Sequence, residues 1–319
     1  MGSTNTTRLK SLGLLLALPM LFAFIFGCAA ASQLPPTQAA YSGPRSYMLA
    51  PAGADILIYV HFDKYRDDPA FSSAVSEFFG PGIDENVRAL GLAAGVSRNM
   101  IDSVTLATAG SSGSISSPYR LVILDGNFSA NTFLAKSISD SSYDYKGVAV
   151  YSFGNGTNSS AVAILGTGVA IAGSSQAVMD AIDVSNGTAG FITASNSQAF
   201  KLADRGSFVT FSSKPSGGTG PIPKPDFFAL GASISSSGNV TGTGYALYPG
   251  ETESSAAVGK IQAALASMQL AVQAKDGAES PAMRLLGNTQ VSQQGAYAII
   301  SFHGNVSDVK AGVSAFESS

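Results

Sequence analysis

The sequence predicts an α+β fold, built mostly of antiparallel sheets with helices packed on one face. Short runs rich in Val, Ile, Phe and Tyr are joined by Gly-containing turns, which is typical of β-hairpins. Stretches with apolar residues at helical spacing follow these hairpins instead of alternating regularly with single strands. The hydrophobic fraction of 45% is high enough to bury a core.

Changes in composition along the chain predict four segments. Residues 1–31 are expected to be a signal peptide or membrane anchor. Residues 32–53 contain several prolines and are expected to form an extended linker. Residues 54–213 and 226–319 are expected to be two α+β halves, separated by an exposed Pro/Gly loop at 215–225.

Each half is predicted to contain strands followed by helices. In the first half we expect strands at 56–62, 103–109, 119–124, 147–153, 161–165 and 169–172, and helices at 70–79, 84–94, 129–138 and 175–182. In the second half we expect strands at 207–212, 230–236 and 241–248, a strand-rich region at 289–302, and helices at 251–270, 281–286 and 306–316.

A weak internal repeat indicates that the halves are related. Residues 147–153 echo residues 295–302, and both segments end in Ser-Phe. Chance similarity in so biased a composition is the alternative to a duplication.

Cys28 is the only cysteine, and it ends the only long apolar run of the chain. Basic residues precede this run and small residues follow it, which is typical of an export signal. Ile25, Gly27 and Cys28 resemble the lipobox of prokaryotic lipoproteins, whose cysteine is lipidated after cleavage, although Phe26 stands where a small residue is usual. Cleavage after Ala31 and an uncleaved membrane-spanning helix are the alternatives. Each predicts that the rest of the chain lies outside the cytoplasm.

Asparagine usage is the second informative feature. Eleven asparagines follow the leader, and six of them begin an Asn-x-Ser/Thr sequon. Such sequons mark surface loops in exported proteins, although Asn, Gly, Ser and Thr also occur together in ordinary turns. We expect all six in exposed turns or helix caps, as candidate glycosylation sites: Asn127, Asn155, Asn158, Asn186, Asn239 and Asn305.

The lipobox-like cysteine, the sequons and the lack of a second cysteine together resemble an archaeal surface lipoprotein, with a bacterial lipoprotein as the alternative. The segment from Pro51 to Asp55 leads into a strand, and a hairpin leads into a helix that begins near Gln176. This order resembles poorly characterised exported prokaryotic proteins over most of residues 51–316. The resemblance implies no known activity or site residues.

Few residues offer catalytic or metal-binding chemistry. His61 shares a strand face with Asp63, but a hydrogen-bonded strand-end histidine is the simpler interpretation, as it is for His303. The acidic group around Asp67 lacks calcium-loop spacing, and Glu251 and Glu253 suit the start of a helix. Paired glycosidase carboxylates need only proximity in space. Tyrosines near predicted strand ends could form a sugar platform, although half-buried strand positions suit them better: Tyr143, Tyr145, Tyr151, Tyr245 and Tyr248. We expect no catalytic residue, metal or cofactor.

These observations predict a membrane-anchored extracellular structural or adhesive binding module of the cell envelope, without catalytic function. Its expected partners are the membrane and envelope proteins or glycans. The net charge of -3 gives no basic surface for nucleic acid. A ligand-capturing surface lipoprotein is the second hypothesis, and a cryptic hydrolase is the third.

Overall fold

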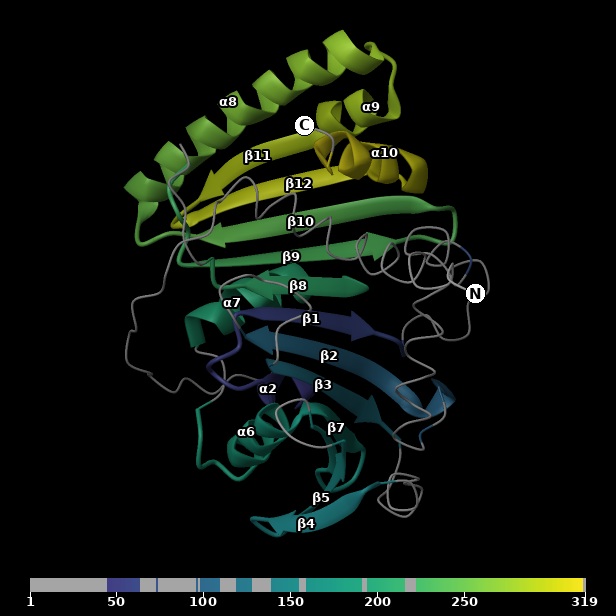
Figure 1. The fold of residues 1–319 in the computed structure, drawn as a ribbon. Coiled ribbons are helices and arrows are strands. Elements are labelled where there is room, and N and C mark those ends of the chain that lie inside the picture. The colour runs from purple at the N-terminus through teal and green to yellow at the C-terminus, as the bar shows by residue number, and fades with distance from the viewer. Residues whose placement is uncertain are drawn as a thin grey trace. The chain divides into compact units, whose positions relative to one another are not determined.

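A computed structural model of the chain shows two compact units whose division falls between Gln198 and Ala199. The structure describes residues 45–63, 73, 96, 98–109, 119–127, 139–154, 159–190, 194–215 and 222–317. Among these residues there are twelve strands, and every strand pair described is antiparallel (Figure 1). The α+β class expected from the sequence is therefore confirmed.

The first unit along the described chain holds seven strands in the order β1-β2-β3-β7-β6-β5-β4. Runs of Val, Ile and Leu form its inner strands because β-branched and aliphatic side chains pack well on a pleated surface. The elements are α2 (Arg45–Met48), β1 (Ile56–His61), η1 (Arg98–Met100), β2 (Ile101–Ala109), β3 (Tyr119–Gly126), β4 (Ser141–Tyr145), β5 (Val148–Phe153), β6 (Ser160–Ile164), β7 (Val169–Ser174) and α6 (Ser175–Ser185).

Alternation along these strands gives the unit two buried faces. One face carries the cluster formed by Val96, Ile101, Val104, Leu124 and neighbouring residues of β6 and β7. Helix α6 buries its apolar side against β3, β6 and β7, and α2 packs against β2 and β3. The six-residue stretch Val169–Ser174 ends in Ser174, which is the N-cap residue of α6.

The second unit holds five strands in the order β11-β12-β10-β9-β8. Its longest helix, α8, contacts β11, β12 and α9, and α9 packs against α10 (Figure 1). The elements are β8 (Val209–Ser213), β9 (Phe227–Ile234), β10 (Asn239–Leu247), α8 (Glu251–Asp276), α9 (Pro281–Gly287), β11 (Thr289–Gln294), β12 (Tyr297–Asn305) and α10 (Val306–Glu317). Helix α7 (Ala194–Asp204) contains the division between the units.

The structure differs from the sequence-based expectations in three elements. Strand β4 and helix α7 were not predicted, and α8 continues to Asp276 instead of ending at Leu270. Residues 45–53, which we expected in the linker, include α2 and bury Tyr47 and Ala50. Their burial makes this end of the linker part of a packed core.

The Pro/Gly loop is only partly described. Its described ends, at 214–215 and 222–225, are irregular as predicted, but Ile222 and Pro225 are buried. The expectation of a wholly exposed loop is therefore wrong at these two residues. The helices expected at 70–79, 84–94 and 129–138 lie outside the described residues, except for the helical Ser73.

Candidate functional site

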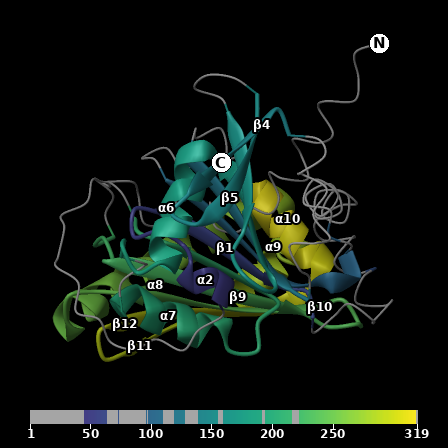
Figure 2. The ribbon, with the colours of Figure 1, turned by 90° about the horizontal axis from the view of Figure 1, so that it is seen from below.

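Strand β4 ends the strand order of its unit and presents a sheet edge. It pairs with β5 from Ser141↔Ser152 to Tyr145↔Val148, and in the described part of the chain no other strand pairs with it (Figures 1 and 2). Its first four residues are exposed, and the Tyr143 side chain is 39% exposed. Unpaired backbone N–H and C=O groups at such an edge can pair with another strand.

The turn that follows β4 has a conformation suited to a tight hairpin. Lys146 and Gly147 both have positive φ angles, 52° and 82°, as a two-residue type I′ turn requires. The Gly147 amide donates a hydrogen bond to Asp144 Oδ1 at 3.0 Å. This local bond fixes the turn, so the register of β4 on β5 is determined.

Contacts with α6 hold the hairpin in place. Lys146 Nζ lies 2.8 Å from Asp183 Oδ1 and donates to Thr188 Oγ1 at 3.2 Å. The Tyr145 hydroxyl donates to Asp183 Oδ2 at 3.3 Å. The hydrogen bond to Asp183 raises the pKa of Lys146, so the ammonium form persists through the neutral range. The edge is therefore presented by a hairpin that is tied to its own unit.

The terminal strand of the other unit, β11, has a helix beside it, although four of its six residues are exposed. Helix α8 lies beside β11, and Gln262 Nε2 of α8 donates to the backbone carbonyl of Val291 at 3.3 Å (Figure 1). Gln293 of β11 donates in turn to the Glu251 carbonyl at 2.9 Å. A covering helix is one of the ways in which proteins protect a sheet edge. The contrast with β11 makes the β4 edge the stronger candidate for binding.

The two faces of β4 carry different chemistry. Tyr143 and Tyr145 share the face that Tyr145 turns toward α6, whereas Ser142 and Asp144 point to the opposite face. A partner strand would therefore meet aromatic rings on one side and a hydroxyl and a carboxylate on the other. Added strands gain affinity from main-chain hydrogen bonds and specificity from alternate side chains.

The His61 and Asp63 pair is present but loose. His61 Nδ1 lies 3.8 Å from Asp63 Oδ1 and 3.4 Å from the Tyr59 hydroxyl, and the His61 side chain is 13% exposed. The ring of Tyr59 also meets the His61 ring edge-on at 4.5 Å. These contacts match the strand-end histidine that we considered the simpler interpretation. No cluster of three metal-ligating side chains occurs among the described residues.

The other residues singled out from the sequence lie apart from one another. His303 is exposed on β12 opposite Thr241, and Glu251 and Glu253 lie in the exposed first turn of α8. Asp67 and Asp68 lie outside the described residues. Among the tyrosines considered for a sugar platform, Tyr248 is buried and Tyr145, Tyr151 and Tyr245 are half-buried, which leaves Tyr143 exposed.

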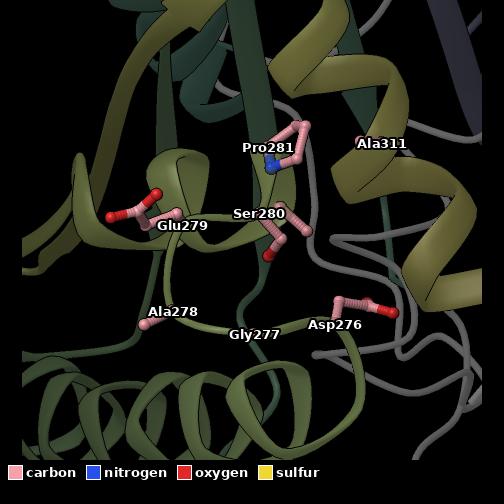
Figure 3. A pocket seen from close by; sticks show the side chains of 8 residues that line it. Asp276, Gly277, Ala278, Glu279, Ser280, Pro281 and Ala311 are labelled. Carbon is pink, nitrogen blue, oxygen red and sulfur yellow. The ribbon is translucent and has the colours of Figure 1, made fainter.

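A shallow hollow of about 710 Å³ lies where α8 ends and α9 begins, and Ala311 of α10 contributes to its wall. Asp276 and Glu279 line it, and their carboxylates point away from each other (Figure 3). The Arg284 guanidinium donates to the Glu279 carbonyl at 2.8 Å and to the buried Asp308 at 2.7 Å. These bonds hold the wall of the hollow.

Four of the six sequon asparagines are described, and all four are exposed, as predicted: Asn127, Asn186, Asn239 and Asn305. Asn186 is the C-cap residue of α6, and the Asn305 side chain accepts the Asp308 amide at the start of α10. Asn239 and Asn305 are cross-strand neighbours on β10 and β12. Asn155 and Asn158 lie outside the described residues, as does Cys28.

Comparison with known proteins gives no functional assignment. No family model and no curated protein matches the chain. Among solved structures, three crystal forms of TP0453, a Treponema protein, are similar to it. Form III is 11% identical with a TM-score of 0.48 and covers 87% of this chain and 100% of its own. Form I is 12% identical with a TM-score of 0.47 and covers 88% and 99%.

Form IV is 13% identical with a TM-score of 0.46 and covers 86% of this chain and 98% of its own. Within the described part of this chain, no helix combines the length and apolarity needed to cross a membrane.

Sequence reasoning missed the β4 edge. The residues Tyr143 and Tyr145 were noted as aromatic, but a strand at Ser141–Tyr145 was not expected. The alternation of Tyr with Ser and Asp before Lys146-Gly147 was the available signal.

Proposed function

We propose that this chain is a non-catalytic, membrane-anchored extracellular binding module of the cell envelope, and that it binds through the β4 edge. The observation that carries the proposal is the β4 edge, to which no second strand pairs among the described residues, with its exposed Tyr143 and its hairpin held by Lys146 and Asp183. An exposed edge strand is a site of strand addition. Envelope proteins, or envelope glycans stacked on Tyr143, are the expected partners.

The apolar run that ends at Cys28 supports the location in this proposal. A lipid on Cys28 would anchor the chain, and the exposed sequon asparagines would carry glycans on a surface protein, as in an archaeal lipoprotein. Prokaryotic lipoproteins normally carry more than one acyl chain, and stable membrane attachment requires at least two such anchors.

The proposal includes two related halves with helices on one face of their sheets. Each unit begins with three consecutive neighbouring strands, β1-β2-β3 and β8-β9-β10. In each, a later strand pairs with the third one, β7 with β3 and β12 with β10, and runs into a helix, α6 or α10. The shared order supports a duplication in which β7 corresponds to β12 and the first half gained β4 and β5. The sequence echo matches β5 with β12 instead, so it does not mark equivalent strands and gives the duplication no support.

A sedimentation assay tests the binding role. Labelled full chain is mixed with two sets of isolated envelopes, one from cells that express the chain and one from cells that lack it. We expect saturable binding to at least one set, and Tyr143→Lys should abolish it because it places a charge in the centre of the edge. Leu202→Lys is the matched control, since Leu202 has the same 39% exposure on α7. Binding to neither set, or equal loss in both variants, would contradict the proposal.

The hollow near α9 supports the second hypothesis, a ligand-capturing surface lipoprotein. Its volume of about 710 Å³ falls in the range of small-molecule sites, and Asp276 and Glu279 would favour a cationic ligand. Native mass spectrometry of the full chain with a diamine such as putrescine, compared with Glu279→Gln, tests this use. A diamine adduct of the full chain that the variant loses supports the hypothesis, and equal adducts contradict it.

A further inference from the structure

We infer that β4 pairs antiparallel with β4 of a second copy of this chain, across a two-fold axis that passes beside Tyr143. This inference rests on the proposed binding role of the β4 edge and names its partner. In such a pair Tyr143 faces Tyr143 of the other copy, and Ser142 faces Asp144.

Charge selects this register. Pairing centred on Tyr143 sets the Asp144 carboxylate of each copy opposite the Ser142 hydroxyl of the other, and it brings no two carboxylates of the strands together. Centring on Asp144 would set two carboxylates directly against each other, and centring on Ser142 would set Asp140 against Asp144. Opposite charges stabilise cross-strand pairs and like charges destabilise them. The edge is therefore self-complementary in one antiparallel register.

Existing contacts leave this register available. The charged groups beside the strand are bonded within their own copy, because Asp140 Oδ2 accepts the Gly154 amide at 2.7 Å and Lys146 Nζ lies 2.8 Å from Asp183 Oδ1. Neither of them has to be displaced when two strands pair in this register. The two Tyr143 rings, each 39% exposed, would cover each other on the face that also carries Tyr145. Isologous contacts of this kind are typical of two-fold dimers.

The short strand implies weak pairing in solution and stronger pairing on a membrane. Five residues bury far less than the roughly 1,000 Å² of a stable interface. Two copies attached to one membrane have a higher effective concentration, which increases association without any new contact. Disulfide trapping of the dimer is therefore the appropriate measurement, because it accumulates a weakly populated pair.

The test uses the full chain with Cys28→Ser, purified in detergent, so that the only thiol is the one introduced. Directly opposed Cβ atoms lie about 4.5–5.5 Å apart in an antiparallel pair, close to the reach of a disulfide. We expect Tyr143→Cys to form several-fold more disulfide dimer under mild oxidation than Leu202→Cys, whose original residue is equally exposed. Mixed Ser142→Cys and Asp144→Cys chains should form more heterodimer than either forms homodimer.

Equal trapping of Tyr143→Cys and Leu202→Cys, with circular dichroism showing both folded, would overturn the inference. So would a mixture of Ser142→Cys and Asp144→Cys that gives no excess of heterodimer. Binding of the full chain only to envelopes that lack it would likewise reject a second copy as partner, but it would leave the proposed binding role intact. Trapping without any envelope binding would instead support the pairing and reject the wider adhesive role.

Discussion

At the scale of single residues, Tyr248 is a buried hydroxyl in an apolar setting. Its side chain is 2% exposed, and Oη finds no hydrogen-bond partner within the described part of the chain. Burial raises the pKa of Tyr248 well above the ordinary value of 10.0. The neutral phenol is therefore favoured in the folded state, and stability that is present below pH 10.0 is lost as pH rises beyond it.

We expect Tyr248→Phe to change the free energy of unfolding by less than about 1 kcal/mol at pH 7, because the hydroxyl makes no bond there that could be lost. Above pH 10 the variant should lose less stability than the parent chain, since one ionisation is removed. Urea unfolding at pH 7 and pH 10.5 measures both effects. Tyr143→Phe is the control, because an exposed phenol should leave the alkaline loss unchanged. A large loss at pH 7 would show that Oη has a partner.

Arg284 and Asp308 form the most buried ion pair described. Arg284 Nη2 and Nε donate to Asp308 Oδ1 at 2.7 and 3.1 Å, and the Asp308 side chain is only 5% exposed. Asp308 also accepts the Asn305 amide at 3.4 Å, while Asn305 accepts the Asp308 amide at 2.8 Å. This reciprocal arrangement is a capping box at the start of α10.

We expect Arg284→Met to lower the free energy of unfolding by about 1–2 kcal/mol, because the buried Asp308 carboxylate loses its cation while solvent screens the pair through the 49% exposed Arg284 side chain. Chemical denaturation at pH 7 measures the change. Lys260→Met removes an exposed cation from α8 and should cost less than about 0.5 kcal/mol. Similar losses in the two variants would mean that the pair contributes no more than a surface charge.

At the scale of elements, two glycines in different surroundings show how packing determines the effect of an added side chain. Gly242 lies in β10 opposite Phe302 of β12, and a Cβ there would overlap the Phe302 ring. Gly259 lies within α8, where an added Cβ would meet nothing within 4 Å. The first glycine admits an aromatic ring across the strand, whereas the second lowers the helical propensity of α8.

The same substitution should therefore have opposite effects at these positions. We expect Gly242→Ala to destabilise the chain by about 1–3 kcal/mol through overpacking against Phe302. Gly259→Ala should stabilise it by up to about 1 kcal/mol through helix propensity. Thermal melts of both variants measure whether each substitution raises or lowers stability. A change in the same direction for both would mean that Phe302 moves aside or that the exposed face of α8 is occupied.

The element scale also shows why the terminal strands differ. Helix α8 buries only Ser254, Ala257 and Ile261, so it is not held by a broad apolar face. Its side chains reach the neighbouring strand instead, with Gln262 donating to Val291 and Gln293 donating to Ser254 Oγ at 2.9 Å. Within the described residues β4 has no such polar contacts along its outer edge, so it is the terminal strand that a partner could pair with.

At the scale of the whole molecule, the proposed location of the chain can be tested at Cys28. If Cys28 carries the lipid, Cys28→Ala should release or misprocess the chain, and the membrane fraction should lose it. Fractionation and intact-mass analysis of membrane-extracted protein measure anchoring, cleavage and glycans together. Ala31→Leu is the control, because it alters the alternative cleavage site and leaves Cys28 in place. If Cys28→Ala stays in the membrane with unchanged mobility, the lipid anchor is wrong and an uncleaved helix is favoured.

Local sequence was sufficient to predict most strands and the longer helices. β-Branched runs, Gly turns and apolar spacing within a few residues were enough to predict three of them: the hairpin at 161–172, strand β2 and the start of α8 at Glu251. The sequon asparagines could be placed on the surface for the same reason, since turns and caps are local structures.

Strand β4 gave a weaker local signal, the alternation of Tyr with Ser and Asp before a Lys-Gly turn. Ser-Ser-Tyr-Asp-Tyr has no β-branched residue, and it becomes a strand because the Lys146-Gly147 turn brings it onto β5. Likewise, Ala194–Asp204 has weak helical spacing and mixed polar residues, so α7 was not anticipated.

The sequence by itself determined the fold class, the extent of most elements and the export-like leader with its single cysteine, because each depends on neighbours along the chain. Only the tertiary structure decided which terminal strand is covered and which is open. That distinction depends on pairs far apart in sequence, Gln262 with Val291 and Lys146 with Asp183. The spacing of residues along the chain does not indicate such contacts, because their partners come together only in the folded structure.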